Sequence, residues 1–506
     1  MNATSGSHAV FVIGNILPQN GGVTNAVYAR ASALASEFER VTILTLQLDL
    51  EFDAHVAWHR QRRSFDPKID VLNIYESGGR KIRDKVKAPF VPEYSYFADS
   101  KRSNAYRVFD SQGCYVRYEA RRADGVLEFV DYFSTPWNRW KKSYFDRFGV
   151  CRRDLYLSAD GTKAEFQVIR DGQGRPVASS KLNGDGRPIS YFFHEMALEF
   201  KTEIDIAVPI VQSMIESSSR ACLFIDKREF VAPLSSVSSA GLKKIFVMHS
   251  NHLDHPFDEI ARISPSAKPA FEALESGDID HMVLLTEYQA GDVKSVVNSR
   301  DRISVINNFI DRSGSRGVET SKRDPLLVVA LARYHYAKNL AAALEVFQVV
   351  HKKIPDARFE IFGYGPELEG LKQYAKSLGV LDSVSFNGHS DSPLAELSRA
   401  SVTLLTSRYE GMPLTLLEAM SVGTPAVAFD IKYGPRDIIR DGVDGVLVPQ
   451  TGDRIQAAGD AVIELLTDAE TWRSFSCAAR SVDERFSIES ARREWRDLIS
   501  RLYSSS

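Results

Sequence analysis

The segment Glu410-Gly-Met-Pro-Leu-Thr-Leu-Leu-Glu418 begins and ends with a glutamate, and the two carboxylates could bind hydroxyl groups of a ligand. A charged hydrogen bond of this kind contributes roughly 1.5–3 kcal/mol, which is enough to set the orientation of a ligand. We expect Glu410 in a loop and Glu418 one turn into the following helix, on the same face as Leu414. Two solvated surface acids are the alternative. The Gly-x-Pro between the glutamates favours a ligand site, because it fits a loop between a strand and a helix.

The residues between these glutamates predict an anion site. Residues 403–406 predict a strand, residues 407–412 (Ser407 to Met412) its following loop, and Pro413 suits the first helical position, where an N–H is not needed. In open parallel sheets, ligands bind where strands end and helices begin, since helix N-termini carry free N–H groups and the positive end of the dipole. We therefore expect the N–H groups of Leu414 and Thr415 to point at a phosphate, and the segment to suit a diphosphate flanked by two hydroxyl-bearing rings.

Two cations, Arg333 and Lys338, follow a predicted strand at residues 326–331 and precede a predicted helix. In this loop they are placed to neutralise a diphosphate leaving group without a metal ion, although each alone would be an ordinary surface charge. Gly363 and Gly365 end another predicted strand, where they make a tight turn or let backbone and ligand approach closely. A proline follows the second glycine, so the spacing of a dinucleotide fingerprint is missing and an oxidoreductase is less favoured.

The N-terminal half offers a second anion site and a histidine. Gly21 and Gly22 precede a predicted helix at residues 24–38, so we expect them to face the first site across a cleft. His249 ends a predicted strand, although a lone histidine is usually structural. Two more histidines follow it at intervals of three residues and invite a metal site. The segment lacks a familiar ligand set and reads as a loop, so we predict no metal.

Short β-branched runs alternate with helical patterns in both halves of the chain, which indicates parallel sheets. The simplest architecture is α/β, with two doubly wound, Rossmann-like domains that face each other across a cleft. The predicted strands are residues 10–13, 41–46, 69–75, 221–225, 244–248, 282–286 and 303–306 in the first half, and 326–331, 359–363, 384–387, 402–406, 426–429 and 446–448 in the second. A polar stretch at residues 311–324 is a predicted linker.

Residues 94–200 have a different pattern. Helical periodicity fades, aromatic residues multiply, and turn signals such as Asp124-Gly and Asp160-Gly recur. This spacing suits consecutive hairpins, so we predict an antiparallel β-meander inserted in the first domain.

The composition describes an ordinary globular protein. The 506 residues are 44% hydrophobic and 25% charged, with a formal net charge of −3, so bulk charge indicates neither disorder nor nucleic-acid binding. The four cysteines are scattered and form no Cys-x-x-Cys pair, which fits a reducing, cytoplasmic setting. No apolar run approaches the ~20 residues that span a bilayer, and association with the inner face of a membrane stays open.

Together these motifs resemble the retaining glycosyltransferases of the GT-B fold, family 4 (glycosyl transferases group 1). The matching pieces are Gly21-Gly22-Val23, His249, Ile306-Asn-Asn-Phe-Ile-Asp311, Arg333 with Lys338, Gly363-Tyr-Gly-Pro366, Glu410-x7-Glu418 and Gly434-Pro-Arg-Asp-Ile-Ile-Arg-Asp-Gly442. The resemblance implies that Arg333 and Lys338 bind the donor diphosphate, Glu418 the ribose and Glu410 the sugar. His249 would contact the transferred sugar, and Gly22 would approach the phosphates through its backbone. The expected donor-binding residues are Gly21, Gly22, Gly363, Gly365, Met412, Leu414, Thr415 and Glu418.

The insertion is similar to that of the subgroup with poly(ribitol-phosphate) and poly(glycerol-phosphate) α-glycosyltransferases and the O-GlcNAc transferase of serine-rich proteins. The resemblance implies that the insertion binds the acceptor and forms oligomers. It also implies a UDP-sugar as donor and no cofactor. Because the sequence shows no convincing nucleophile, the implied mechanism is transfer at the front face of the sugar. An anionic acceptor could meet basic residues of the insertion, and a solvated sheet face is the alternative. These basic residues are Lys101, Arg102, Arg107, Arg117, Arg121, Arg122, Lys141 and Lys142.

Two other functions stay open. A catalytically silent partner subunit could keep the fold and bind only acceptor, although the motif residues are all present. A phosphorylase with pyridoxal phosphate has no supporting motif. The predicted domains are residues 1–93 and 201–312 (N-terminal acceptor domain), 94–200 (insertion), 313–485 (nucleotide-sugar-binding domain) and 486–506 (a helix that packs back on the N-terminal domain).

Overall fold

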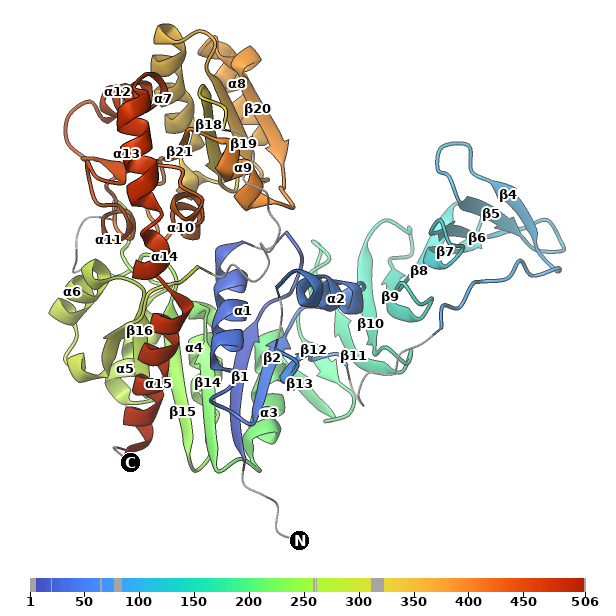
Figure 1. Ribbon diagram of the computed structural model, residues 1–506. Helices are drawn as coiled ribbons and strands as arrows, with labels where there is room; N and C mark the ends of the chain where they lie inside the picture. Colours follow the sequence, from blue (N-terminus) through green and yellow to red (C-terminus); the bar gives the residue numbers. More distant parts are fainter. Residues whose placement is uncertain are drawn as a thin grey trace.

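The computed structural model describes residues 6–19, 21–63, 66–76, 84–257, 260, 262–310 and 323–504. Two α/β halves are stacked, and a long antiparallel sheet projects sideways from the lower one (Figure 1). This arrangement confirms the predicted fold class. The predicted linker at residues 311–324 lies almost entirely outside the described residues.

The N-terminal half is built on a seven-stranded parallel sheet with the order β17-β16-β15-β14-β1-β2-β3. Its central strands are continuous apolar runs, because helices cover both faces of a doubly wound sheet. In β1, for example, Ala9, Val10, Phe11 and Val12 are all fully buried. The strands are β1 (Ser7–Ile13), β2 (Arg40–Thr45), β3 (Ile69–Asn73), β14 (Arg220–Ile225), β15 (Leu242–Met248), β16 (His281–Leu284) and β17 (Ile303–Val305). The helices are α1 (Gly22–Leu34), α2 (Phe52–Arg63), α3 (Glu203–Ile215), α4 (Val231–Ser235), α5 (Lys268–Ser276) and α6 (Glu287–Val296).

The C-terminal half has a six-stranded parallel sheet with the order β20-β19-β18-β21-β22-β23. The strands are β18 (Leu327–Leu331), β19 (Arg358–Phe362), β20 (Val384–Gly388), β21 (Val402–Leu405), β22 (Ala426–Phe429) and β23 (Gly445–Val448). The helices are α7 (Leu340–Lys353), α8 (Leu368–Ser377), α9 (Pro393–Arg399), α10 (Leu414–Ser421), α11 (Pro435–Ile438), α12 (Arg454–Thr467), α13 (Ala469–Ala479), α14 (Val482–Arg485) and α15 (Ile488–Ser504). Every strand predicted in either half is present, with ends shifted by at most a few residues.

Helix α15 leaves the C-terminal half and packs along α1 of the other half (Figure 1). Arg492 Nε donates to the carbonyl of Ala33 at 3.0 Å, and the Tyr503 hydroxyl donates to the carbonyl of Ala221 at 2.7 Å. The indole ring of Trp495 is buried against Phe224 of β14. Helix α15 therefore joins the two halves by a second connection. The predicted domain boundaries themselves stay predictions.

The insertion is a ten-stranded antiparallel sheet in which each strand pairs with the next, as the turn signals predict. Turn glycines take positive φ, for example 85° at Gly125 and 71° at Gly161, where other residues would be strained. The strands are β4 (Ser95–Ala98), β5 (Ala105–Phe109), β6 (Tyr115–Arg121), β7 (Leu127–Thr135), β8 (Asn138–Phe145), β9 (Cys151–Leu157), β10 (Ala164–Arg170), β11 (Pro176–Lys181), β12 (Tyr191–Phe193) and β13 (Leu198–Phe200).

Most basic side chains of the insertion are bound to carboxylates of the protein. Of the eight basic residues that the sequence offered to an anionic acceptor, seven lie within 4 Å of an aspartate or glutamate. The partner of Arg122 is Glu51, which lies outside the insertion. The carboxylates reduce the positive charge that the sheet offers to an anionic acceptor. No described helix is long and apolar enough to cross a membrane.

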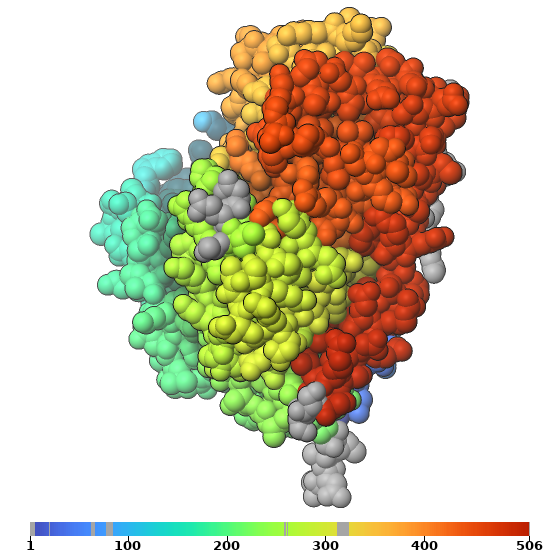
Figure 2. Space-filling model, turned by 90° about the vertical axis from the view of Figure 1, so that its left-hand side faces the viewer, coloured from blue at the N-terminus to red at the C-terminus, as the bar shows by residue number. Residues whose placement is uncertain are grey.

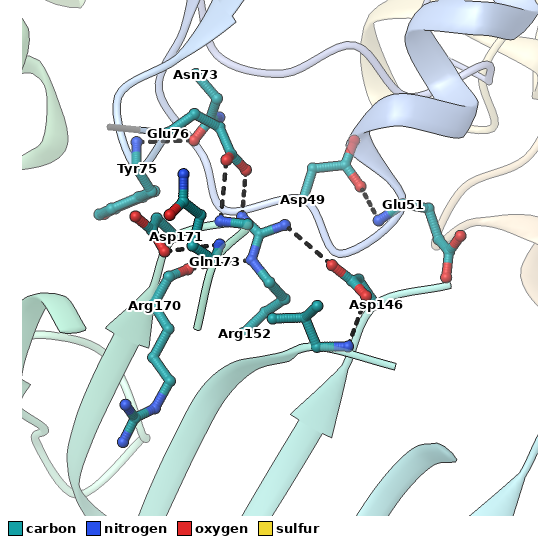
Figure 3. Close-up of polar contacts among 12 residues, drawn as sticks. Asp49, Glu51, Asn73, Tyr75, Glu76, Asp146, Arg152, Arg170, Asp171 and Gln173 are labelled. Carbon is teal, nitrogen blue, oxygen red and sulfur yellow. Dashed lines mark hydrogen bonds and ion pairs between the residues drawn. The ribbon is translucent and has the colours of Figure 1, made fainter. Parts of the chain in front are cut away.

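One buried cation fixes the insertion to the first sheet (Figure 3). Arg152 of β9, with 4% of its side chain exposed, forms an ion pair with Glu76, which follows β3. The Nη1 atom of Arg152 lies 3.7 Å from Asp146 Oδ2. The second oxygen of Glu76, Oε2, accepts from the N–H of Gly172 at 3.0 Å. Three turns of the insertion and of the first sheet thus meet around one guanidinium.

We expect Arg152→Ala to lower the free energy of unfolding by about 3–5 kcal/mol, because it leaves two carboxylates in a largely buried place without their cation. The midpoint of urea unfolding measures this change. Arg102→Ala is the matched control, since Arg102 and Glu128 are each 43% exposed and such a pair contributes less than about 1 kcal/mol. An equal effect of the two substitutions would contradict the anchoring role of Arg152.

Candidate active site

Each parallel sheet has a switch point, where successive strands leave in opposite directions and ligands bind beyond the carboxyl ends. In the C-terminal sheet it lies between β18 and β21, and in the N-terminal sheet between β1 and β14. The loops after β18 and β21 carry Arg333, Lys338 and Glu410, whereas the loops after β1 and β14 carry Gly21 and Asp226. Figure 2 shows the two halves in contact along the face on which yellow-green meets orange.

The two halves approach each other through backbone. A Cβ on Gly411 would lie 2.3 Å from the carbonyl oxygen of His249, and one on Gly22 would lie 3.7 Å from Leu414. The Tyr364 hydroxyl donates to the carbonyl of Gln19 at 2.9 Å. The glycines at the start of α1 therefore face the start of α10, as the sequence predicts.

Helix α10 begins at Leu414, so Pro413 is its N-cap and not its first helical residue. The prediction is wrong by one position, because Pro413 has an extended ψ of 108° and ends the loop. The consequence for the anion site is small. The N–H groups of Leu414 and Thr415 have no acceptor within the helix, and no described residue outside it accepts from them.

Lys338 and Glu410 form one unit at this site. The Lys338 ammonium lies 2.5 Å from Glu410 Oε1, and the Ser407 hydroxyl donates to the same oxygen at 2.7 Å. Both charged side chains are only partly exposed, 23% for Lys338 and 12% for Glu410. The pair orients both groups toward one place, where the lysine can contact a phosphate and the free glutamate oxygen can accept from a hydroxyl.

Most of the remaining predicted donor residues lie on α10 or next to it. Arg333 is exposed after β18 and forms no ion pair with a described residue. Glu418 and Leu414 line a hollow between the halves together with Asn25 of α1. Thr415 and Lys338 line a second hollow on the other side of α10. Lys338 thus lies next to the start of α10, whereas Arg333 is placed only in the loop after β18, and the roles of all these residues toward a donor stay predictions.

Met412 is placed differently from the other predicted donor residues. Its side chain is buried, and its sulfur accepts from the N–H of Asn308 at 3.2 Å. The Asn308 amide also donates to the Met412 carbonyl at 3.4 Å. Met412 therefore contacts the segment after β17, on the N-terminal side of the cleft.

The Gly-x-Gly lets two loops of the protein approach each other. A Cβ on Gly363 would lie 1.9 Å from the carbonyl oxygen of Ala332, and one on Gly365 would lie 2.2 Å from that of Tyr334. Tyr334 N–H also donates to the Tyr364 carbonyl at 2.9 Å. The approach of these two loops fixes the loop that carries Arg333, and the predicted approach of backbone and ligand stays a prediction.

His249 is held from the N-terminal half. Its Nε2 lies 2.6 Å from Asp226 Oδ1, and the same oxygen accepts from the buried Arg30 of α1. Burial by itself raises the pKa of the Asp226 carboxyl, but the charge of Arg30 and the hydrogen bond with His249 bring it below its usual value. Asp226 is therefore a carboxylate at neutral pH.

The neighbouring histidines take no part in this arrangement. His252 is buried and stacks on Tyr433, and its burial, with the charge of Arg228, lowers its pKa to about 4. His255 is exposed. Within the described ranges, no three His, Cys, Asp or Glu side chains gather as metal ligands.

Sequence reasoning missed a contact that joins the halves behind Glu410. Asp292 of α6 accepts from Lys432 Nζ and from the Tyr433 hydroxyl, each at 2.8 Å. The backbone of Lys432 and Tyr433 pairs in turn with that of Glu410, at 3.3 and 3.1 Å. The signal in the sequence was the motif that begins at Gly434, directly after Tyr433.

Comparisons with known proteins agree with this fold. Residues 311–482 match the family model described as glycosyl transferases group 1. The chain is a glycosyltransferase of the GT-B fold.

Its relatives act on polymers or proteins. It is 23% identical over 508 residues to poly(glycerol-phosphate) alpha-glucosyltransferase of Bacillus subtilis (strain 168), which covers 96% of this chain and 74% of the relative. It is also 23% identical to poly(ribitol-phosphate) alpha-N-acetylglucosaminyltransferase of Staphylococcus aureus (strain COL). This match covers 95% of this chain and 97% of the relative.

Solved structures show the same fold along nearly the whole chain. The G117R mutant of S. aureus TarM, in complex with fondaparinux, alpha-GlcNAc-glycerol and UDP, matches with a TM-score of 0.82 and 22% identity. The match covers 97% of this chain and 99% of the TarM chain. The pneumococcal O-GlcNAc transferase GtfA in complex with UDP and GlcNAc matches with a TM-score of 0.79 and 18% identity, covering 98% and 99%.

We expect Gly363→Ala to lower the free energy of unfolding by more than about 3 kcal/mol, because a side chain there combines a strained φ of 153° with a backbone clash. Gly379→Ala is the control. Gly379 has a φ of 73° but no atom within 4 Å of its Cβ position, so only the conformational strain of about 1–2 kcal/mol applies. Thermal unfolding of both variants measures the difference, and equal losses would refute the close approach.

Proposed function

We propose that this chain transfers a hexose or N-acetylhexosamine from a UDP-sugar, with retention of anomeric configuration. The acceptor is a hydroxyl of a teichoic-acid-like polymer or of a serine-rich protein. One observation carries the proposal: Lys338, Glu410 and the free N–H groups at the start of α10 face the glycines of α1 across the boundary between the halves.

The donor diphosphate would lie at the start of α10. A helix N-terminus carries a partial positive charge, and Lys338 and the exposed Arg333 add two full ones. Three sources of positive charge then stabilise the departing UDP, so the proposed reaction needs no metal ion and no cofactor. Glu418, one turn into α10, would bind the ribose, and Glu410 the sugar.

Two relatives support the choice of donor and acceptor. S. aureus TarM is described with UDP and alpha-GlcNAc-glycerol, and pneumococcal GtfA with UDP and GlcNAc. The relatives from B. subtilis and S. aureus act on poly(glycerol-phosphate) and poly(ribitol-phosphate). The same kind of donor and a hydroxyl-bearing acceptor would fit the chemistry of this site.

Transfer would proceed at the front face of the sugar. A retaining glycosidase places a second carboxylate about 5–5.5 Å from the first as a nucleophile. Here Glu410 is bound to Lys338 and Ser407, which suits it to orient a hydroxyl better than to attack carbon. The leaving diphosphate would itself take the proton of the acceptor hydroxyl, and positioning of the two substrates would supply much of the acceleration.

The insertion belongs to the acceptor side of the proposal. It is anchored by Arg152 beside the carboxyl ends of β2 and β3, on the acceptor half. Binding of the polymer along this sheet, oligomer formation through it, and a cytoplasmic location at the inner face of the membrane are parts of the same proposal.

Release of UDP from UDP-glucose, UDP-GlcNAc and UDP-galactose tests the function, with poly(glycerol-phosphate), poly(ribitol-phosphate) or a serine-rich peptide as acceptor. We expect one donor to be turned over, equally well with EDTA, and an α-linked product by proton NMR. Purified protein that neither hydrolyses nor transfers from any of the three would support a silent partner subunit instead.

We expect Lys338→Met to reduce transfer by at least about a hundredfold, because one charge next to the leaving group is lost. Its effect on thermal stability should be small, because the partly exposed Glu410 keeps the hydrogen bond from the Ser407 hydroxyl. Lys372→Met is the matched control, because Lys372 forms an exposed pair with Glu369 on α8 of the same half. Wild-type turnover by Lys338→Met would remove Lys338 from the mechanism.

A further inference from the structure

His249 is bound to an unusual buried group. Asp226 has a fully buried side chain that accepts through one oxygen, Oδ1, from both His249 and Arg30. Its other oxygen, Oδ2, is buried and has no partner among the described residues. One carboxylate oxygen therefore connects helix α1 with the histidine at the end of β15.

Three aromatic rings surround Arg30 beside this oxygen. Its guanidinium carbon lies 5.5 Å from the centre of the Phe11 ring, 5.4 Å from that of Phe224 and 5.2 Å from that of Trp495. Aromatic faces attract a cation at such distances. The rings come from β1, β14 and α15 and form an aromatic box around Arg30. One of its three rings, that of Trp495, is thus supplied by the helix that returns from the C-terminal half.

These contacts settle which nitrogen of His249 carries a proton. Asp226 is ionised and can only accept, so Nε2 must be the donor. In a neutral imidazole, Nδ1 is then an acceptor with a free lone pair. Nδ1 has no partner among the described residues, and it is not among the buried nitrogens that are shut off from solvent.

The place of His249 gives this tautomer a use. Its backbone carbonyl lies against Gly411, next to Glu410, so the residue borders the cleft from the N-terminal half. We propose that Asp226 and Arg30 are positioning residues, which hold His249 with Nε2 protonated so that Nδ1 accepts a hydrogen bond from a hydroxyl of the donor sugar. This inference deepens the proposed function and rests on it.

The wild-type protein gives the first test, independent of activity. In protein labelled with ¹⁵N-histidine, long-range ¹H–¹⁵N correlations distinguish protonated from unprotonated ring nitrogens, and His249→Gln assigns the signals of His249. We expect a protonated Nε2 and an unprotonated Nδ1 at neutral pH. A proton on Nδ1 would overturn the proposal, whether or not any UDP-sugar is turned over.

Two variants separate positioning from stability. In Asp226→Asn, the amide oxygen can take the place of Oδ1 and accept from both Arg30 and His249. The NH2 group then takes the place of the unbonded Oδ2. The opposite orientation is disfavoured, because it would point the NH2 group at the N–H donors of Arg30. Arg30 then keeps an uncompensated charge. We expect a lower melting temperature but kcat for UDP release from UDP-glucose or UDP-GlcNAc within about fivefold of wild type.

The double variant Arg30→Met with Asp226→Leu does the reverse. It replaces a buried ion pair with apolar side chains of similar size, which often leaves stability unchanged. It also removes the acceptor for Nε2, so the imidazole becomes free to turn and to exchange tautomers. We expect a melting temperature near that of wild type, at least a tenfold loss of kcat, and a dissociation constant for UDP within about threefold of wild type.

The outcomes distinguish the two proposals. If kcat follows the melting temperature across both variants, Asp226 and Arg30 are merely structural and the inference fails. Wild-type kcat in the double variant contradicts it as well. If the wild-type protein turns over none of the UDP-sugars, the proposed function fails, and the wild-type spectrum still decides the tautomer. Should Asp226→Asn not fold, the double variant and the spectrum provide the decision.

Discussion

Gly411 lies so close to the carbonyl of His249 that no side chain fits between them. Because backbone meets backbone there, the carboxyl end of β15 and the loop after β21 are parts of one surface. Glu410 stands beside this contact, and Lys338 is bound to Glu410. The charges that would hold a diphosphate and the histidine that would contact a sugar are thus brought together from two sheets.

Two further contacts stabilise this approach of the halves. Asp292 of α6 binds Lys432 and Tyr433, whose backbone pairs with that of Glu410. Helix α15 returns to α1 and completes the aromatic box around Arg30. Each half of the site is therefore positioned in part by the other half of the chain. A substitution in either contact should therefore change the geometry of the site, although the substituted residue contacts no substrate.

The elements could be predicted from the sequence because their signals are local. Alternating β-branched runs mark both parallel sheets, and turn glycines mark the meander, so every predicted strand is present. Arg333, Lys338, Glu410 and Glu418 could be found because fixed spacing places them next to a strand end or a helix start. The prediction for Pro413 was wrong by one residue, since proline is compatible with both the N-cap and the first helical position.

Long-range partners could not be read in the same way. Arg30 and Asp226 are 196 positions apart, and nothing in either neighbourhood shows that a buried ion pair joins them. The basic residues of the insertion looked available to an anion, yet most are bound to carboxylates. Arg117 and Arg121 bind Glu119 of their own strand, and Arg122 binds Glu51. Lys141 and Lys142 bind aspartates of neighbouring strands. Strand register decides the pairs between neighbouring strands, and the pattern of residue types does not fix register closely enough.

The most direct test of the account is a crystal structure of the protein with UDP. We expect the diphosphate oxygens within hydrogen-bond distance of the N–H groups of Leu414 and Thr415 and of the side chains of Arg333 and Lys338, with the ribose at Glu418. A diphosphate bound elsewhere, for example at the start of α1 without contact to α10, would contradict the assignment of the donor site.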